Sequence, residues 1–147
     1  MEPSLQFYFY LNQEDSPDTG EFCLKFSHPV IASIKFFTTH SFDIVRYRGS
    51  YFGDAGLSFK HEFNSKLSMD SVLSLAWASN KFNEVYIGFP KTAFNLVTAG
   101  VSFTYYVNDT IYLSPHIETQ VILDSNLQDQ LDKPTIFNGG LAIGMEF

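Results

Sequence analysis

Two ionisable side chains suited to proton transfer stand two residues apart in the sequence, at His116 and Glu118. Residues i and i+2 of a β-strand point to the same face, so an imidazole and a carboxylate at this spacing share a surface. Lys60 and Glu62 repeat the pattern, and across a barrel they would meet the first pair. One interpretation is a proton-transfer or ligand-binding site. We favour a network of salt bridges filling a narrow barrel, because an isolated buried charge is costly.

Other kinds of catalytic or metal site lack their sequence patterns. No nucleophile-elbow pattern is found, and Ser114 points the same way as His116 without meeting it. A single cysteine, Cys23, excludes an internal disulfide and a cysteine cluster, and we assign it no role. The remaining histidines show no zinc-ligand spacing: His28, His40 and His61. We therefore predict no catalytic residue, no cofactor and no metal ion.

The composition favours a surface that does not face water everywhere. Aromatic residues make up 17% of the 147 residues and charged residues another 17%, below the roughly 25% charge typical of soluble domains. The net charge of −7 argues against nucleic acid as a partner, because phosphate binding needs a basic face. No apolar run reaches the roughly 18 residues of a transmembrane helix. A basic-then-apolar signal peptide is also missing at Met1.

The elements that would position these side chains are β-strands, because apolar and polar residues alternate with a period of two. In the segment 51–63, aromatic and aliphatic residues share one face with His61, while Asp54, Lys60 and Glu62 share the other. Pro115 is a flaw in the scheme, since a proline inside a strand removes a ladder hydrogen bond. About eight strands are expected, at 5–11, 21–26, 30–39, 51–63, 67–77, 97–107, 111–121 and 137–147.

The connections between these segments alternate in length. Long ones at 13–20, 43–49, 80–91 and 124–134 are separated by short ones at 27–29, 64–66 and 108–109. Outer-membrane barrels have long extracellular loops and short periplasmic turns, so the pattern favours that class.

Charged residues in the long connections are expected to be solvated. The acidic ones match no calcium-loop spacing: Glu14, Asp15, Asp18, Glu21, Asp124, Asp129 and Asp132. Arg46, Tyr47 and Arg48 form a basic-aromatic tip. We expect an ordinary loop there, the alternative being contact with anionic lipid headgroups or sugars.

The polar face of the strands is predicted to line the barrel, with the bulky apolar face against lipid. Small residues on the polar face suit the narrow interior of eight strands. A soluble lipocalin-like barrel would reverse the two faces and bind a small apolar ligand inside. The predicted interior polar network is Lys35, Asp54, Lys60, Glu62, Asp70, His116, Glu118 and Glu146.

The end of the chain carries apolar residues at alternate positions, Leu141, Ile143, Met145 and Phe147. This pattern resembles the terminal strand of bacterial outer-membrane barrels, and the resemblance implies recognition by the barrel-assembly machinery. Segments 49–63, 82–88, 112–117 and 123–129, followed by Phe137, make the chain similar to the C-terminal part of porin-like bacterial outer-membrane proteins.

The sequence thus predicts one domain, 1–147, forming an all-β, antiparallel up-and-down transmembrane barrel in the bacterial outer membrane. It is expected to be a mature form, an engineered form or a fragment, and the resemblance implies missing N-terminal hairpins as one possibility. We predict outer-membrane lipid as a partner, an open oligomeric state, and a structural or porin-like role in passive transport without catalysis. The alternatives are the soluble ligand-binding barrel and an outer-membrane enzyme that would lose activity on replacing His116 or Glu118.

Overall fold

The alternating segments form eight β-strands in the computed structural model, which describes residues 2–8 and 19–145. Each strand pairs antiparallel with the next one along the chain, so the sheet order is β1 to β8 without a crossover. The predicted all-β, up-and-down sheet is confirmed. The elements are β1 (Glu2–Tyr8), β2 (Thr19–Ile31), β3 (Ile34–Asp43), β4 (Tyr51–Asn64), β5 (Leu67–Ala78), α1 (Asn80–Tyr86), β6 (Ala93–Tyr106), β7 (Ile111–Ile122), α2 (Ser125–Gln128) and β8 (Thr135–Met145).

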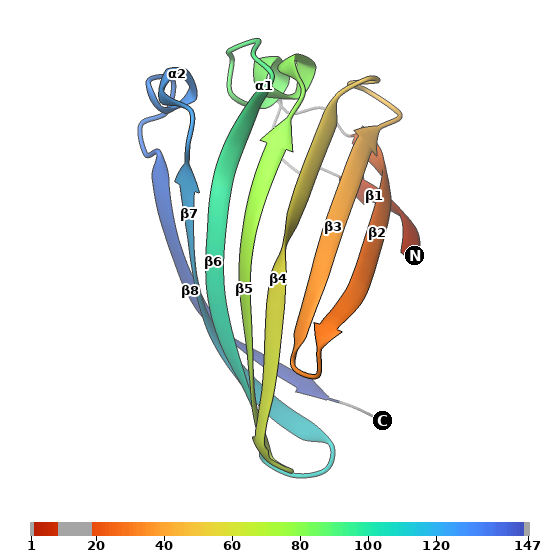
Figure 1. Cartoon of the computed structure of the whole chain (residues 1–147), viewed down its shortest axis with the longest axis vertical. Coiled ribbons are helices and arrows are strands. Elements are labelled where there is room, and N and C mark those ends of the chain that lie inside the picture. Colours follow the sequence, from red (N-terminus) through yellow and green to blue (C-terminus); the bar gives the residue numbers. More distant parts are fainter. Residues whose placement is uncertain (1, 9–18, 146–147) are drawn as a thin grey trace.

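The sheet is curved and has two edge strands, β1 and β8 (Figure 1). The closed ring that we expected is not present within residues 2–8 and 19–145. β1 is only seven residues long and its described register is with β2, whereas β8 pairs with β7. The ends with long connections gather at one rim, where α1 and α2 lie, and the short turns gather at the other.

The register pairs apolar residues with apolar residues and polar residues with polar residues on neighbouring strands. The sheet therefore has one apolar and one polar face. Leu57, Leu73 and Ala99 are cross-strand neighbours on the apolar face, while Ser74 and Thr98 are neighbours on the polar one. A one-residue slip would exchange the two faces, so the pattern specifies the register strongly.

The polar face is the concave one. A hollow of about 390 Å³ is lined by Ser58 of β4, Asp70 of β5, Ser102 of β6 and His116 of β7. One hollow can be lined from four consecutive strands only where the sheet curves inward. We refer to this as the concave face, and to the face bearing Leu57, Leu73 and Ala99 as the convex face.

The molecule has almost no hydrophobic core. Its accessible surface is 9786 Å², whereas a folded monomer of this mass exposes about 7,600 Å². Cys23, Ala76, Ala78 and Leu127 are its buried apolar residues within the described part of the chain. All of them lie toward the rim with the long connections, so most of the convex face is uncovered.

Two prolines account for local departures from the expected strands. The turn predicted at 27–29 is wrong, because β2 continues through Pro29 to Ile31. β1 covers β2 only as far as Lys25, so Pro29 leaves no ladder bond unmade on that side, and the register shifts beside it. Pro115 does lie inside β7, and the pairing of β7 with β6 is interrupted between His116 and Leu113.

Two further boundaries differ from the expectation. The connection between β6 and β7 spans 107–110 rather than two residues. At its ends, Val107 donates its backbone N–H to Ile111 O at 2.9 Å. Asn108 closes this turn by accepting the backbone N–H groups of Thr110 and Ile111. The helices α1 and α2 were not predicted.

Candidate functional site

The polar side chains proposed from the sequence lie on the concave face, apart from Glu146, which falls outside the described residues. Lys60 Nζ lies 3.3 Å from Glu62 Oε1, and both side chains are exposed. Asp70 is the cross-strand neighbour of Lys60. An exposed ion pair of this kind contributes little to stability, about 0–1 kcal/mol. These charges therefore face water rather than a dry core.

His116 and Glu118 line the hollow of about 390 Å³ together with Asp70 and Ser114. Glu118 Oε1 accepts a hydrogen bond from Gln120 Nε2 at 2.7 Å. The expected meeting with Lys60 or Glu62 does not occur among the described residues, because β5 and β6 separate β4 from β7. No hydrogen bond joins His116 to Ser114 or Glu118 within the same part of the chain. His116 is thus an exposed imidazole, and the described residues assemble no nucleophile and base around it.

A second hollow, of about 540 Å³, lies on the concave face near the short turns. Lys35, Lys60, Glu62 and Asp70 line it, so Asp70 borders both hollows. Asp54 lines neither of them and sits higher on β4, opposite Thr39. The structure thus brings most of the predicted polar set to two adjoining hydrated hollows.

On the convex face, three aromatic side chains are joined near the rim with the long connections. Tyr51 Oη accepts the indole N–H of Trp77 at 2.9 Å and lies 2.9 Å from His40 Nδ1. Gly53 makes room for this cluster, since a Cβ there would approach Tyr51 Oη to 2.5 Å and Trp77 Cε2 to 2.7 Å. Paired polar atoms on large apolar rings suit a boundary between lipid and water.

A second aromatic level lies nearer the short turns, at Phe59, His61 and Phe63. The His61 ring centroid is 6.2 Å from that of Phe59 and 4.6 Å from that of Phe63. Tyr51 and His61 are ten residues apart on β4, which is about 33 Å along a strand. Aliphatic side chains such as Leu57 fill the interval.

The terminal strand β8 presents its predicted apolar residues on the convex face. Leu141, Ile143 and Met145 are exposed by 62%, 70% and 58%. Phe147 lies outside the described residues. Their pairing with β7 is continuous over the whole strand, so the exposed residues belong to an ordered edge.

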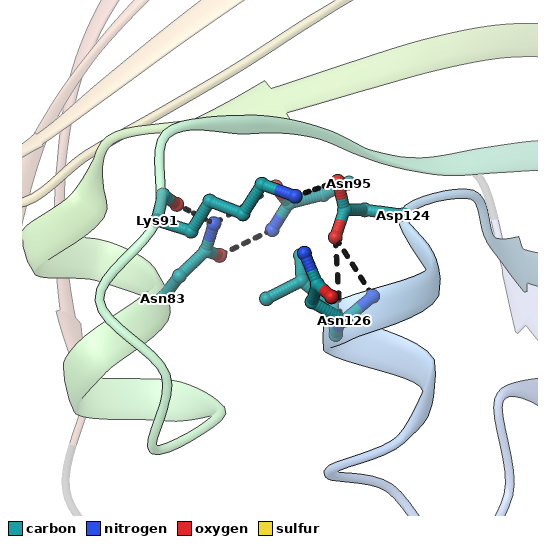
Figure 2. A network of polar contacts seen from close by, with 6 residues as sticks. Asn83, Lys91, Asn95, Asp124 and Asn126 are labelled. Atoms are coloured by element: carbon teal, nitrogen blue, oxygen red, sulfur yellow. Dashed lines mark hydrogen bonds and ion pairs between the residues drawn. The ribbon is translucent and has the colours of Figure 1, made fainter.

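The rim with the long connections is organised by a buried pair of asparagines (Figure 2). Asn83 of α1 and Asn95 of β6 donate to each other, with Nδ2 to Oδ1 distances of 3.1 Å and 2.5 Å, and Asn83 also donates to Lys91 O. Asn95 is the extra residue of a β-bulge, since Phe94 pairs with Trp77 and Leu96 with Ala76. A bulge re-aims a side chain, and here it places an amide against the helix.

A charged contact joins this pair to α2. Lys91 Nζ lies 2.7 Å from Asp124 Oδ2, while Asp124 Oδ1 accepts the backbone N–H groups of Asn126 and Leu127 at the start of α2. The hydrogen bond from Lys91 holds the pKa of Asp124 below its ordinary value of 3.8, and the backbone bonds act in the same direction. The Leu127 side chain is fully buried beneath this contact.

The connection between β3 and β4 is held by a buried carboxylate, Asp43. Its Oδ2 accepts the Thr19 hydroxyl at 2.5 Å, and its Oδ1 accepts the backbone N–H groups of Val45 and Tyr47 at 3.0 and 2.8 Å. These local bonds replace the ladder bonds that the loop lacks. The connection is therefore ordered rather than a loose loop.

The rim residues have weak sequence signals. Ser79 and Asp124 accept backbone N–H groups as N-caps of α1 and α2, and such residues before a helix are recognisable. Asn83 and Asn95 carry no signal of their own, because their pairing depends on the bulge.

Further tests for a familiar site give no positive result. Within the described residues, no three His, Cys, Asp or Glu side chains are grouped to hold a metal ion. No helix in this part of the chain is long and apolar enough to cross a membrane. No protein-family model, curated protein or solved structure matches the chain.

Proposed function

We propose that the chain forms the wall of a bacterial outer-membrane β-barrel with a structural or porin-like, passive-transport role, and that it carries no catalysis. One observation carries the proposal: the convex face is an ordered, exposed apolar surface bounded by two aromatic levels. The ten residues between Tyr51 and His61 span about 33 Å along β4. At the roughly 40° tilt of strands in outer-membrane barrels this interval would be about 25 Å high, which is the height of their apolar band.

The exposure of large apolar side chains supports lipid as the medium that covers the convex face. Leu73 and Ile117 are exposed by 57% and 51%, and Phe137 by 72%. Contiguous apolar patches of this kind are rare on soluble monomers. The concave face carries the charges and the two hollows, the reverse of a soluble barrel that binds an apolar ligand.

We infer that the edges of β1 and β8 pair with each other when the sheet is embedded. In hydrocarbon an unpaired backbone N–H or C=O costs several kcal/mol, so an open edge is not tolerated there. A ring of eight strands would leave a narrow lumen containing His116 and Glu118. Boiled and unboiled samples should migrate differently on a denaturing gel, the unboiled band having the mass of a monomer. A heat-sensitive dimer band would mean that a second copy supplies the partner edges.

The single tryptophan, Trp77, provides the decisive test of membrane insertion. Its fluorescence is measured in vesicles of phosphatidylcholine brominated at shallow or deep acyl positions. We expect quenching by both, and stronger quenching by the shallow lipid, because Trp77 belongs to the aromatic cluster near the rim.

In a Trp77→Phe background, two matched variants place a single tryptophan on the convex or on the concave face, and its quenching by brominated lipid is measured. Leu73→Trp, at the middle of β5 on the convex face, should be quenched most by the deep lipid. Val72→Trp, its neighbour on the concave face, should be quenched by neither. Equal quenching at positions 72 and 73, or none at any position, would sink the proposal.

A further inference from the structure

We propose that Arg46, Arg48 and Lys81 form a docking surface for the phosphate groups of anionic membrane lipids. These three side chains are called the rim cations below. The inference rests on the membrane location proposed above, and it adds a preferred lipid and the residues that select it.

The fold brings the rim cations together from two connections. The connection that follows β3 is anchored by Asp43 and turns back at Gly49, whose φ of +87° suits glycine. Arg48 Nε donates to Ile44 O at 3.0 Å, which fixes the guanidinium against the loop. Lys81 of α1 donates its ammonium N–H to Arg48 O, so a residue 33 positions later in the chain joins the same cluster.

These contacts position the cations without neutralising them. The acceptors are backbone carbonyls, and the two ion pairs that residues 19–145 make among themselves are Lys60–Glu62 and Lys91–Asp124. The rim cations are all exposed. Lys81 contacts the connection at Arg48, and Arg46 is exposed two residues earlier in that connection. This connection and the start of α1 thus carry three of the nine lysines and arginines of a protein of net charge −7.

The surroundings of the cluster select a lipid over a dissolved anion. Ile44 and Val45, in the same connection, are exposed by 41% and 50%. Ile44 extends the pairing of β3 by donating to Gly20 O at 2.9 Å, and it follows Phe42 on the convex face. Ile44 and Val45 would therefore meet acyl chains, while the rim cations later in the chain would meet the phosphates of the same bilayer leaflet.

The chemistry of the groups fits a phosphate diester. A guanidinium presents N–H donors that bind two phosphate oxygens at once. Among the described residues, Arg48 uses one of its donors, on Ile44 O. Basic residues near an anionic membrane surface are each worth roughly a fivefold change in binding constant. A cluster of three is therefore sufficient for a measurable preference.

Trp77 reports on the lipid beside this surface, because it lies four residues before Lys81. Brominated phosphatidylglycerol and brominated phosphatidylcholine are titrated separately into vesicles containing the folded protein, and the quenching curves give their relative binding constants. We expect phosphatidylglycerol to be preferred at least fivefold at low salt. The preference should fall toward unity in Arg46→Gln/Arg48→Gln/Lys81→Gln and in concentrated salt.

Lys66→Gln provides the matched control, since it removes one positive charge at the opposite rim. It should leave the preference at Trp77 unchanged, whereas Arg48→Gln alone should reduce it severalfold. Absence of a preference in the natural protein, or a preference that survives the triple substitution, would overturn the inference. Absence of quenching by either lipid would overturn the membrane proposal itself.

Discussion

The rim with the long connections and the middle of the sheet are stabilised in different ways. At the rim, the side chains of Asn83, Asn95 and Leu127 are buried and those with polar atoms are hydrogen-bonded. In the middle of the sheet, Leu57 of β4 and Leu73 of β5 are exposed although they are direct cross-strand neighbours. The rim is stabilised by contacts between its own side chains. The middle of the sheet is stabilised by backbone hydrogen bonds and by whatever medium covers the convex face.

On the proposed membrane location, the two regions have different reference solvents, which are water at the rim and hydrocarbon on the convex face. Substitutions at the rim should cost the same free energy of unfolding in detergent and in a bilayer. Charged substitutions on the convex face should cost more than those on the concave face, because hydrocarbon rejects charge that water accepts.

The largest effect is expected from Leu73→Lys. A cation at the middle of the convex face should lower the free energy of unfolding in vesicles by about 3 kcal/mol, as found for Lys at the midplane of membrane barrels. Urea unfolding in vesicles measures it. Ser102→Lys is the control, because that residue lines a hydrated hollow beside Asp70 and should be nearly neutral. Equal losses at both sites would contradict the assignment of the faces.

Asn83→Ala should lower the free energy of unfolding by about 2 kcal/mol, because it leaves the buried Asn95 amide without its partner. The double variant Asn83→Ala/Asn95→Ala should cost less than the sum of the two single ones. Asn80→Ala, at the exposed start of α1, serves as the control. A loss that differs between detergent and vesicles would show that the stability of the rim depends on the surrounding lipid.

A smaller effect is expected for Tyr51→Phe, about 1 kcal/mol, since the Trp77 indole N–H loses its acceptor. Circular dichroism during urea unfolding measures the change. Tyr105→Phe is the matched control, because Tyr105 is exposed on the same face nearer the short turns. A larger loss for Tyr105→Phe would argue against a distinct aromatic level at Tyr51.

The smallest effect is local and depends on pH. Because the pKa of folded Asp124 lies below 3.8, its contribution is complete above the unfolded pKa and is lost as pH falls through the folded pKa. The protection factors of the Asn126 and Leu127 amides against hydrogen exchange, which correct for the intrinsic effect of pH on exchange, should therefore fall only in that acidic window. Lys91→Gln should move the transition toward the ordinary value, and a transition unchanged by this variant would show that Lys91 is not its cause.

Much of the sheet could be predicted from the sequence, because side chains alternate with a period of two in every strand. That rule placed Leu73 and Trp77 on one face and Asp70 and Ser74 on the other. It failed at Pro29, where the tolerance of a proline depends on how far β1 extends along β2.

The rim could not be predicted in the same way. Helices of seven and four residues are too short to show helical periodicity, so their N-cap residues, Ser79 and Asp124, are the only signal that the sequence offers for them. The Asn83–Asn95 pair depends on one extra residue in β6, and Lys81 reaches Arg48 only after α1 has folded. Such contacts depend on the tertiary arrangement rather than on local pattern.

The interruption at Pro115 has a mechanical consequence. β7 is joined to β8 without a gap, but its attachment to β6 lacks the pairs between Ser102–His116 and Tyr105–Leu113. Under a force applied to the end of the chain, this seam shares the load among fewer bonds than its neighbours do. The last two strands should therefore tear away together as a ribbon, leaving the first six as a sheet.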